Sequence, residues 1–386
     1  MSGEDNLMSY GVYVHWPFCA SICPYCDFNV HLDRGADPVL WGDAFEREIR
    51  SYAARIERRP VETVFFGGGT PSLMPPRLVA DILHAIDAAL GLADGAEISL
   101  EANPADVDLG DMQGLRAAGV TRLSLGIQSF EDQELAFLGR THSGAEAVAG
   151  FELARQVFPT VSFDMIYALP GQTEAGWAQN LQQALALAPD HLSAYQLTIE
   201  PRTPFFKLQK LGRLVEPDED RQVALFEMTH QTCLAGGYEH YEVSNFARAG
   251  QVCRHNLNIW RGADYIGLGP GAHGRITFRD KPCIRQAGLN HKKPEAWLAA
   301  VREKGTGLAT LTPLTPQECG EEALLFGLRL TEGLDLSRLE GTGLGLDGGK
   351  VSDLCAAGLC ELQNNVLRLT DGGRLVLNGV LGALLS

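Results

Sequence analysis

The chain has 386 residues, 45% of them hydrophobic, which is enough for one large domain and a smaller second one, each with its own core. The formal net charge of −16, from 32 basic and 48 acidic residues, argues against a nucleic-acid partner, because such binding needs clustered Lys and Arg. The simplest interpretation of this charge is that it keeps the protein soluble.

The sequence contains no run of about 18 uncharged apolar residues, so we expect no membrane span. The first ten residues, MSGEDNLMSY, are acidic and polar, unlike a secretory signal, and we therefore expect a cytoplasmic protein. The nine cysteines are an odd number, and three of them lie between residues 19 and 26. This pattern favours reduced thiols and a metal over a disulfide framework.

The first half of the chain alternates short apolar, β-rich runs with helical stretches. We expect strands at 11–15, 62–66, 97–101, 121–126, 160–166 and 191–199. We expect helices between them at 38–55, 75–90, 106–118, 143–157 and 174–187. Strands that alternate with helices predict parallel βαβ units in an α/β fold. Six such units within about 190 residues favour a partial (β/α)6 TIM-like barrel over a small doubly wound sheet.

In the second half of the chain the alternation of strands and helices is less regular. We assign residues 1–285 to the partial barrel with an extension, 286–311 to a connector, and 312–386 to a small, mostly helical, winged-helix-like domain. In that domain Thr315 opens a capping box, Gly333 is a stop signal, and a helix at 347–357 should end at Gly358. A hairpin at 359–369 should turn at Asn364-Asn365. The domain lacks a basic recognition face, so DNA binding is not implied.

Three cysteines follow the first strand with C-x3-C-x2-C spacing, namely Cys19, Cys23 and Cys26. Thiolates are the natural ligands of a 4Fe–4S cluster. Three of them leave one iron open for the amino and carboxylate groups of a small molecule, as in a catalytic metal site that reserves a position for substrate. A structural zinc site with His15 or His31 is the alternative. The aromatic and proline residues around the cysteines form a dry wall, which favours the cluster.

With this motif the sequence resembles the radical S-adenosylmethionine superfamily, and more closely the branch that contains oxygen-independent coproporphyrinogen III oxidase and its relatives. The resemblance runs from about Tyr13 to the C-terminal domain. It implies that the chain binds a 4Fe–4S cluster and S-adenosylmethionine. It also implies that one electron splits the sulfonium, giving methionine and a 5′-deoxyadenosyl radical. A reductant protein such as a flavodoxin or ferredoxin is then an expected partner.

Polar residues follow successive strands, as expected for a site at the C-terminal ends of barrel strands. The second strand ends in a GGGTP turn, where glycines let the backbone approach a ligand closely, although a tight turn without a ligand is the alternative. The resemblance places the following residues around S-adenosylmethionine or beside the cluster: Tyr13, Tyr25, Gly68, Gly69, Thr70, Glu101, Gln128, Arg140 and Asp164.

Two features separate the chain from a true coproporphyrinogen oxidase. That enzyme has a further cysteine two residues after the third ligand, where this chain has Phe28, and it has an arm before the cluster that is almost missing here. Two phrases, CDFN at 26–29 and CRHNLNIW at 253–260, resemble the heme chaperone (HemW-type) group. That resemblance implies that His255 is a heme-linked residue, although Ile259 replaces the tyrosine of the group's motif.

A structural histidine packed against Trp260 is the alternative for His255, and His273 is a rival candidate. We expect a protein that binds heme and delivers it to heme-accepting proteins. The second hypothesis is a radical enzyme, like coproporphyrinogen III oxidase, that acts on a tetrapyrrole. The sequence assigns no catalytic residue. It leaves open whether the chain forms a homodimer and whether cofactor cleavage is turnover or a regulatory step.

Overall fold

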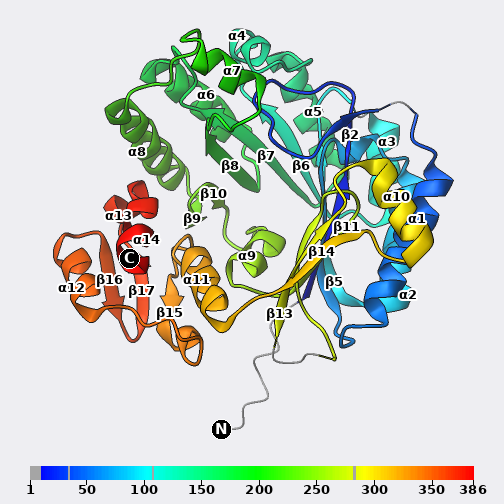
Figure 1. Ribbon diagram of the computed structural model, residues 1–386. Coiled ribbons are helices and arrows are strands. Elements are labelled where there is room, and N and C mark those ends of the chain that lie inside the picture. Colours follow the sequence, from blue (N-terminus) through cyan, green and yellow to red (C-terminus); the bar gives the residue numbers. More distant parts are fainter. Residues whose placement is uncertain (1–9, 34, 107, 281–283) are drawn as a thin grey trace.

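The computed structural model describes residues 10–33, 35–106, 108–280 and 284–386 (Figure 1). The amino-terminal stretch for which we expected no signal peptide lies, except for Tyr10, outside the described residues, as does Cys283. The eight described cysteines are all free, as the cysteine pattern predicted. No described helix is both long and apolar enough to span a membrane.

One twelve-stranded sheet forms the frame of the larger part. At its centre are six parallel, adjacent strands: β1 (Tyr10–Trp16), β4 (Val61–Gly68), β5 (Leu92–Ala102), β6 (Arg122–Gln128), β7 (Thr160–Tyr167) and β8 (His191–Gln196). The six predicted strands are therefore confirmed. In the described ladder β1 pairs in parallel with β11 and β8 pairs with β10, so these pairings do not join β1 to β8 and agree with a partial barrel.

Helices cover the outer face of these strands (Figure 1). The five predicted helices are α1 (Pro38–Ala53), α2 (Pro76–Leu90), α3 (Leu109–Ala118), α5 (Gly144–Val157) and α6 (Glu174–Ala186), and α4 (Asp132–Phe137) is an additional short one. Side-chain caps start α1, α3, α5 and α6, for example the capping box of Ser143 and Glu146, whereas α2 begins at Pro76 without one. Because strand residues alternate between faces, apolar side chains such as Val64 and Phe66 pack under the helices while the other face carries polar groups.

The two edges of the sheet were not predicted. On one edge β11 (Tyr265–Leu268), β12 (His273–Thr277), β13 (Arg285–Asn290) and β14 (Leu308–Pro313) follow one another, with α10 (Pro294–Lys304) between the last two. On the other edge lie β10 (Asn245–Ala247) and β9 (Glu239–Glu242). Three helices precede or separate these strands: α7 (Pro204–Lys210), α8 (Glu219–Ala235) and α9 (Arg254–Trp260). The segment expected as a connector thus supplies strands to the sheet.

The C-terminal part has an apolar cluster of its own. It comprises α11 (Pro316–Gly327), β15 (Leu334–Asp335), α12 (Gly348–Ala356), β16 (Cys360–Gln363), β17 (Val366–Leu369), α13 (Asp371–Leu375) and α14 (Leu377–Leu385). The predicted capping box at Thr315 is confirmed. The predicted hairpin turn at Asn364-Asn365 is also confirmed, and both asparagines have a positive φ. The helix ends before Gly333, which instead forms a left-handed turn into β15. The exact domain limits stay a prediction.

A buried carboxylate ties α1 to the sheet edge. Glu48 is fully buried and accepts hydrogen bonds from four groups: the backbone N–H of Gly269 (2.9 Å) and of Gly307 (2.8 Å), Asn290 Nδ2 (3.0 Å) and Trp297 Nε1 (3.2 Å). These donors come from the β11–β12 loop, β13, α10 and the start of β14. One side chain of α1 therefore fixes the elements that extend the sheet beyond β1.

We expect Glu48→Ala to lower the free energy of unfolding by about 3 kcal/mol or more, because it leaves several buried donors without an acceptor. Denaturant unfolding followed by circular dichroism measures this change. The control is Glu46→Ala, which removes an exposed carboxylate paired with Arg50 on the same helix and should change stability by less than about 1 kcal/mol. Equal effects of the two variants would contradict the assignment.

Candidate active site

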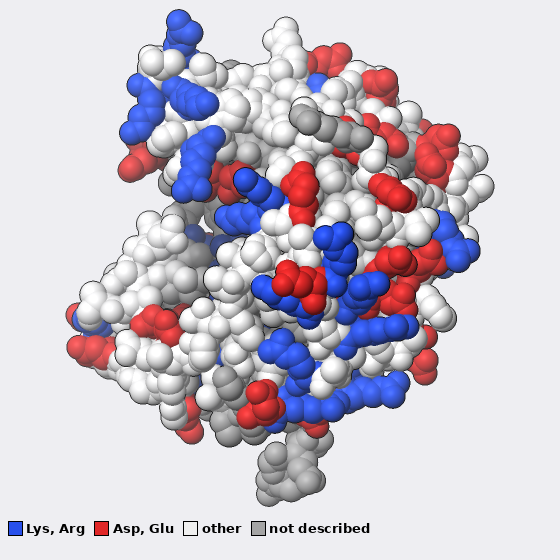
Figure 2. All heavy atoms as spheres, turned by 45° about the vertical axis from the view of Figure 1, so that its right-hand side comes forward, with Lys and Arg blue, Asp and Glu red and all other residues white. Residues whose placement is uncertain are grey.

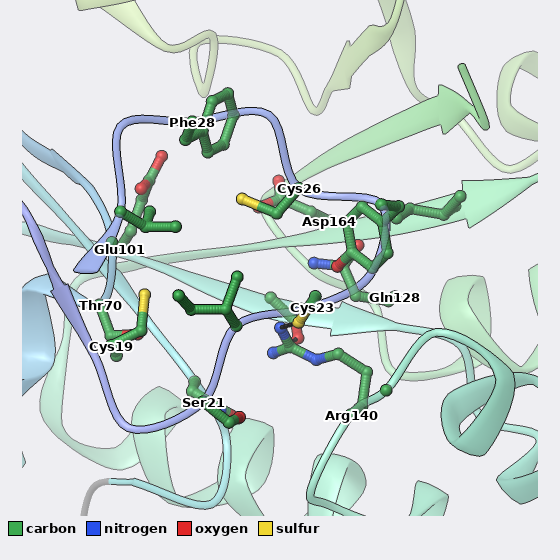
Figure 3. Close-up of a pocket in the computed structure, with 18 of the residues that line it drawn as sticks. Cys19, Ser21, Cys23, Cys26, Phe28, Thr70, Glu101, Gln128, Arg140 and Asp164 are labelled. Carbon is green, nitrogen blue, oxygen red and sulfur yellow. Dashed lines mark hydrogen bonds between the residues drawn. The ribbon is translucent and has the colours of Figure 1, made fainter. Parts of the chain in front are cut away.

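The three cysteines of the motif lie on a loop that leaves the carboxyl end of β1 (Figure 3). Cys19 is part of β2 (Phe18–Cys19), which pairs in parallel with β3 (His31–Leu32) and so closes the loop. Cys19 and Cys23 are buried and Cys26 is half-buried, with the Cys26 N–H donating to the Cys23 carbonyl at 3.2 Å. The loop therefore presents three thiols from one compact turn.

The GGGTP turn is joined to this loop by hydrogen bonds. The Gly69 N–H donates to the Trp16 carbonyl (2.7 Å), and the Thr70 N–H donates to the Phe18 carbonyl (2.8 Å). A Cβ on Gly69 would lie 2.5 Å from the Phe18 carbonyl oxygen. The glycine is thus required by close approach of two backbones, in addition to any approach to a ligand.

Gly68 shows the same constraint. Its φ is +112°, and a Cβ there would lie 2.6 Å from the His15 ring. His15 in turn uses both ring nitrogens, with Tyr13 Oη at 3.1 Å and the Asn29 carbonyl at 2.9 Å. Because both nitrogens are engaged, His15 is not available as the fourth ligand of a zinc site.

The cysteine loop and the ends of β4 to β8 enclose a cavity of about 380 Å³. All three cysteines line it, together with every residue predicted around the cofactor except Tyr13: Tyr25, Gly68, Gly69, Thr70, Glu101, Gln128, Arg140 and Asp164. Figure 3 shows the labelled ones of these residues, the three cysteines, Thr70, Glu101, Gln128, Arg140 and Asp164, around one space. Tyr13 instead stacks on Phe65, with ring centroids 6.3 Å apart.

Other residues that line the cavity were missed in the sequence. Asn103 and Asp106 follow β5, and Tyr195 lies near the end of β8. The rule that sites gather at the carboxyl ends of strands could have found the first two. Gln128 ends β6 with a φ of +72° at a register shift against β7, a backbone conformation that is strained for a residue other than glycine.

Arg140 connects the cluster loop to the strands. Its Nη1 donates to Cys23 Sγ at 3.5 Å and its Nη2 to the Gly126 carbonyl at 2.8 Å. Its Nε is buried and has no hydrogen-bond partner among the described residues. The guanidinium therefore holds a positive charge beside the thiols and keeps one donor free for a ligand.

Two carboxyl groups lie deep in the cavity. Burial raises the pKa of Glu101 to about 8, with a further increase from the charge of Asp164, while the Gly68 N–H acts in the opposite direction. Burial likewise raises the pKa of Asp164 to about 6, against the lowering effect of the Ser193 hydroxyl and the Arg140 charge. Both carboxylates therefore lack a cationic partner that would compensate their loss of water.

Burial has the same effect on the pKa of the thiols. Burial raises the pKa of Cys26 to about 11 and also raises that of Cys19, so a nearby positive centre is needed to hold them as thiolates. As the side chains stand, no group of three or more His, Cys, Asp or Glu residues in the described chain is placed to hold a metal ion. In an iron–sulfur cubane each thiolate binds a different iron, so the three need not meet at one ion.

The cavity therefore fits the predicted ligands in chemistry. The iron cluster supplies the positive charge that the thiols need. A sulfonium amino acid brings cationic groups for Glu101 and Asp164 and a carboxylate for the unpaired Nε of Arg140. The fit rests on the donor and acceptor types that line this single cavity.

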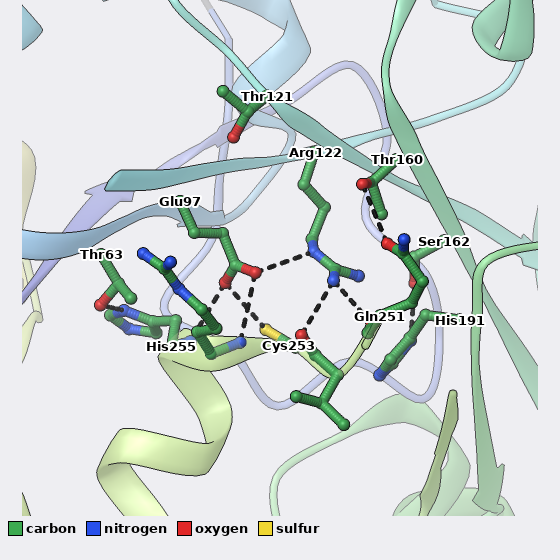
Figure 4. Close-up of polar contacts among 12 residues, drawn as sticks. Thr63, Glu97, Thr121, Arg122, Thr160, Ser162, His191, Gln251, Cys253 and His255 are labelled. Carbon is green, nitrogen blue, oxygen red and sulfur yellow. Dashed lines mark hydrogen bonds and ion pairs between the residues drawn. The ribbon is translucent and has the colours of Figure 1, made fainter. Parts of the chain in front are cut away.

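His255 does not line this cavity and lies next to Gly11 and Thr63, in the amino-terminal halves of β1 and β4 (Figure 4). Its Nδ1 is 2.9 Å from Thr63 Oγ1, and its ring stacks on Phe65 at 5.2 Å rather than on Trp260. Burial lowers the pKa of His255 to about 3. Its Nε2 is buried without a hydrogen-bond partner in the described chain. His273 is exposed and does not line the cavity either.

An ion pair anchors the segment that carries His255. Glu97 on β5 accepts from the N–H groups of Arg254 (3.2 Å) and His255 (3.1 Å) and pairs with Arg122 at 3.3 Å (Figure 4). Arg122 also donates to the carbonyls of Gln251 (2.7 Å) and Val252 (3.0 Å). This buried pair thus fixes the start of α9 to the inner face of the sheet.

Comparison with known proteins identifies the family. Residues 13–184 match the model of the radical SAM superfamily, and residues 314–376 match that of the HemN C-terminal domain. The cow protein "Radical S-adenosyl methionine domain-containing protein 1, mitochondrial" is 37% identical, over 97% of this chain and 87% of its own length. The Bacillus subtilis protein "Heme chaperone HemW" is 35% identical, over 97% of this chain and 98% of its own length.

This chain belongs to the radical SAM superfamily. Its similarity to proteins named heme chaperone HemW, over 97% of the chain for the Bacillus subtilis protein, places it in the HemW-type group. Among solved structures, coproporphyrinogen III oxidase (HemN) from Escherichia coli matches with a TM-score of 0.82 and 24% identity, over 98% of this chain and 90% of that one, which shows a shared fold. Membership of the radical SAM superfamily implies a 4Fe–4S cluster and S-adenosylmethionine.

We expect Cys23→Ala to abolish the cluster absorbance near roughly 400 nm in the anaerobically reconstituted radical SAM protein, because only two of the three thiolates would remain. Iron and sulfide analysis should show a parallel loss. The control is Cys319→Ala on α11, outside the cavity, which should leave the spectrum unchanged. A normal cluster in Cys23→Ala would count against the ligand assignment.

The raised pKa of Glu101 predicts a pH-dependent stability of the cluster-free protein. A carboxyl whose folded-state pKa is about 8 stabilises the fold below its ordinary value of 4.5, and this contribution is lost as the pH rises through 8. Between pH 4.5 and 8 the free energy of unfolding should therefore fall by at most about 1.4 kcal/mol per pH unit, and the melting temperature should fall with it. Glu101→Gln should flatten the fall.

Thermal unfolding at several pH values between about pH 5 and about pH 8 provides the measurement, where the pH range follows from the shifted pKa. Glu62→Gln, an exposed carboxylate on β4, serves as the control and should keep the wild-type slope. An identical slope in wild type and Glu101→Gln would show that Glu101 is ionised in the ligand-free cavity.

Proposed function

We propose that this radical SAM protein binds heme and delivers it to heme-accepting proteins. The observation that carries the proposal is its similarity, over 97% of the chain, to a protein named heme chaperone. A second relative of that name, from Escherichia coli, is 40% identical over 75% of the chain. The similarity to the first includes both the cavity residues and the C-terminal part.

Cys19, Cys23 and Cys26 would hold the cluster, and Glu101, Asp164 and Arg140 would orient S-adenosylmethionine. When bound together, these two groups supply a one-electron reductive cleavage of the sulfonium that produces a carbon radical. The chain's own residues bind both groups, balance their charges and keep the cavity dry. An electron donor such as a flavodoxin or ferredoxin is the partner that this chemistry requires.

Phe28 supports the heme chaperone over a coproporphyrinogen oxidase. It stands where the oxidase pattern has a further cysteine, lines the cavity and is 64% exposed. An exposed aromatic ring at the mouth offers an apolar contact instead of a thiol. The fold shared with the oxidase is compatible with either function, because fold alone does not determine chemistry.

His255 is the proposed heme ligand. Because it is buried, it can bind heme only after a conformational change. Because Nε2 is buried, axial coordination requires that α9 move away from Thr63 and Phe65. The hydrogen bond at Nδ1 leaves Nε2 free for a metal, as in other ligating histidines whose second nitrogen is held by a neighbour. Heme binding would thus open the segment that the Glu97–Arg122 pair holds.

The proposal predicts that the reconstituted protein binds heme, gives 5′-deoxyadenosine after dithionite reduction, and forms no protoporphyrinogen from coproporphyrinogen III. Heme titration followed by absorbance, with product analysis of the same sample, tests all three. His255→Ala should weaken heme binding at least about tenfold, which corresponds to loss of about 1.4 kcal/mol or more. His273→Ala should bind heme as the wild type does. Formation of protoporphyrinogen would overturn the proposal in favour of the oxidase.

A further inference from the structure

The segment around α7 is basic in an acidic protein. Residues 201–215 contain Arg202, Lys207, Lys210 and Arg213 but no Asp or Glu, although the whole chain carries a net charge of −16. Acidic residues flank this stretch on both sides: Glu200, Glu216, Asp218, Glu219 and Asp220. All four basic side chains belong to exposed residues, and none forms an ion pair with a carboxylate within the described ranges. Figure 2 shows Lys and Arg side chains in several groups on the surface, one of them at the top of the view.

The inner side of α7 packs on the cysteine loop. The Phe205 N–H donates to the carbonyl of Pro24, which lies between Cys23 and Cys26, at 3.1 Å. The buried Phe205 ring lies 6.3 Å from the ring of Tyr25, which lines the cavity. The basic segment is therefore the outer cover of the loop that holds the cluster ligands.

The same surface exposes large apolar side chains. Leu211 is 67% exposed and Val215 is 73% exposed, while Lys210 lies over the Phe206 ring at 5.2 Å. Apolar side chains surrounded by unpaired cations are typical of a surface that docks an acidic protein, because the charges steer the encounter and the apolar groups are covered on contact.

We propose that this α7 face, made of Arg202, Lys207, Lys210, Leu211, Arg213 and Val215, docks a small acidic electron-carrier protein. The inference rests on the proposed function, which needs a one-electron donor, and it adds the surface that receives that donor. The carrier is oxidised by one electron and the cluster is reduced by one, with no atom or proton exchanged. Two features favour this partner. The face lies over the cysteine loop, and its positive charge is opposite to the net charge of the chain.

The test compares two variants with the same change in net charge. The first combines Lys207→Glu, Lys210→Glu and Arg213→Glu. The control combines Arg47→Glu, Arg58→Glu and Arg279→Glu, three exposed residues, of which Arg58 precedes the amino end of β4, opposite to the cysteine loop. The probe is a flavodoxin with an acidic surface, titrated in its oxidised form by calorimetry at low and at moderate salt.

We expect the α7 variant to bind the flavodoxin at least tenfold more weakly than the control variant at low salt, and wild-type affinity to fall with salt. The rate at which reduced flavodoxin bleaches the cluster absorbance should fall in parallel, while bleaching by dithionite stays at the wild-type rate. Equal flavodoxin affinity in the two variants would overturn the proposal. Binding to anionic lipid vesicles is measured in parallel. The proposal would also be overturned if the α7 variant lost vesicle binding but still bound the flavodoxin as tightly as the control variant.

The result separates this inference from the proposed function. Formation of 5′-deoxyadenosine with dithionite tests the radical function alone, because dithionite is a small reductant that needs no docking surface. If dithionite gives the product and the two variants bind flavodoxin equally, the docking inference fails and the function stands. If dithionite gives no product while the α7 variant alone loses flavodoxin binding, the function fails and the docking surface stands.

Discussion

The geometry of the site depends on the backbone hydrogen bonds between the GGGTP turn and the chain that leads into the cysteines. Two hydrogen bonds, from Gly69 to Trp16 and from Thr70 to Phe18, hold β4 and the cysteine loop at a distance that leaves no space for a Cβ. The first cluster ligand and the first cofactor-binding turn are thereby fixed to each other. Movement of one strand end would displace both halves of the cavity together.

Electrostatics explains why this cavity is incomplete by itself. Glu101, Asp164 and the thiols of Cys19 and Cys26 all have a raised pKa, in each case mainly because burial disfavours their charged form. The charge of Arg140 lowers the pKa of Asp164 and of Cys19, but in both groups burial has the larger effect. The cavity is thus built for ligands that bring positive charge, which an iron cluster and a sulfonium both do.

The sequence predicted the elements that repeat and missed those that do not. Six βα units with apolar strands and capped helices were found because each carries a strong local pattern, and the cavity residues followed from their place after those strands. Strands β9 to β14 escaped because they are short and, except for β11, antiparallel, so no βα repeat marks them in the sequence. Tyr13 does not line the cavity but packs on Phe65 and forms a hydrogen bond with His15, so its expected place beside the cofactor stays a prediction.

The position of α9 couples two parts of the molecule mechanically. At its start, His255 packs against Gly11 of β1 and Thr63 of β4, and at its end Trp260 contacts Phe326 on α11 at 5.6 Å and lies under Arg329 at 4.4 Å. A rotation that brings the imidazole to the surface would also disturb the indole's contacts. Exposing His255 would therefore weaken the contacts of Trp260 with the C-terminal part. A molecule that displaced α11 would in turn change the exposure of His255.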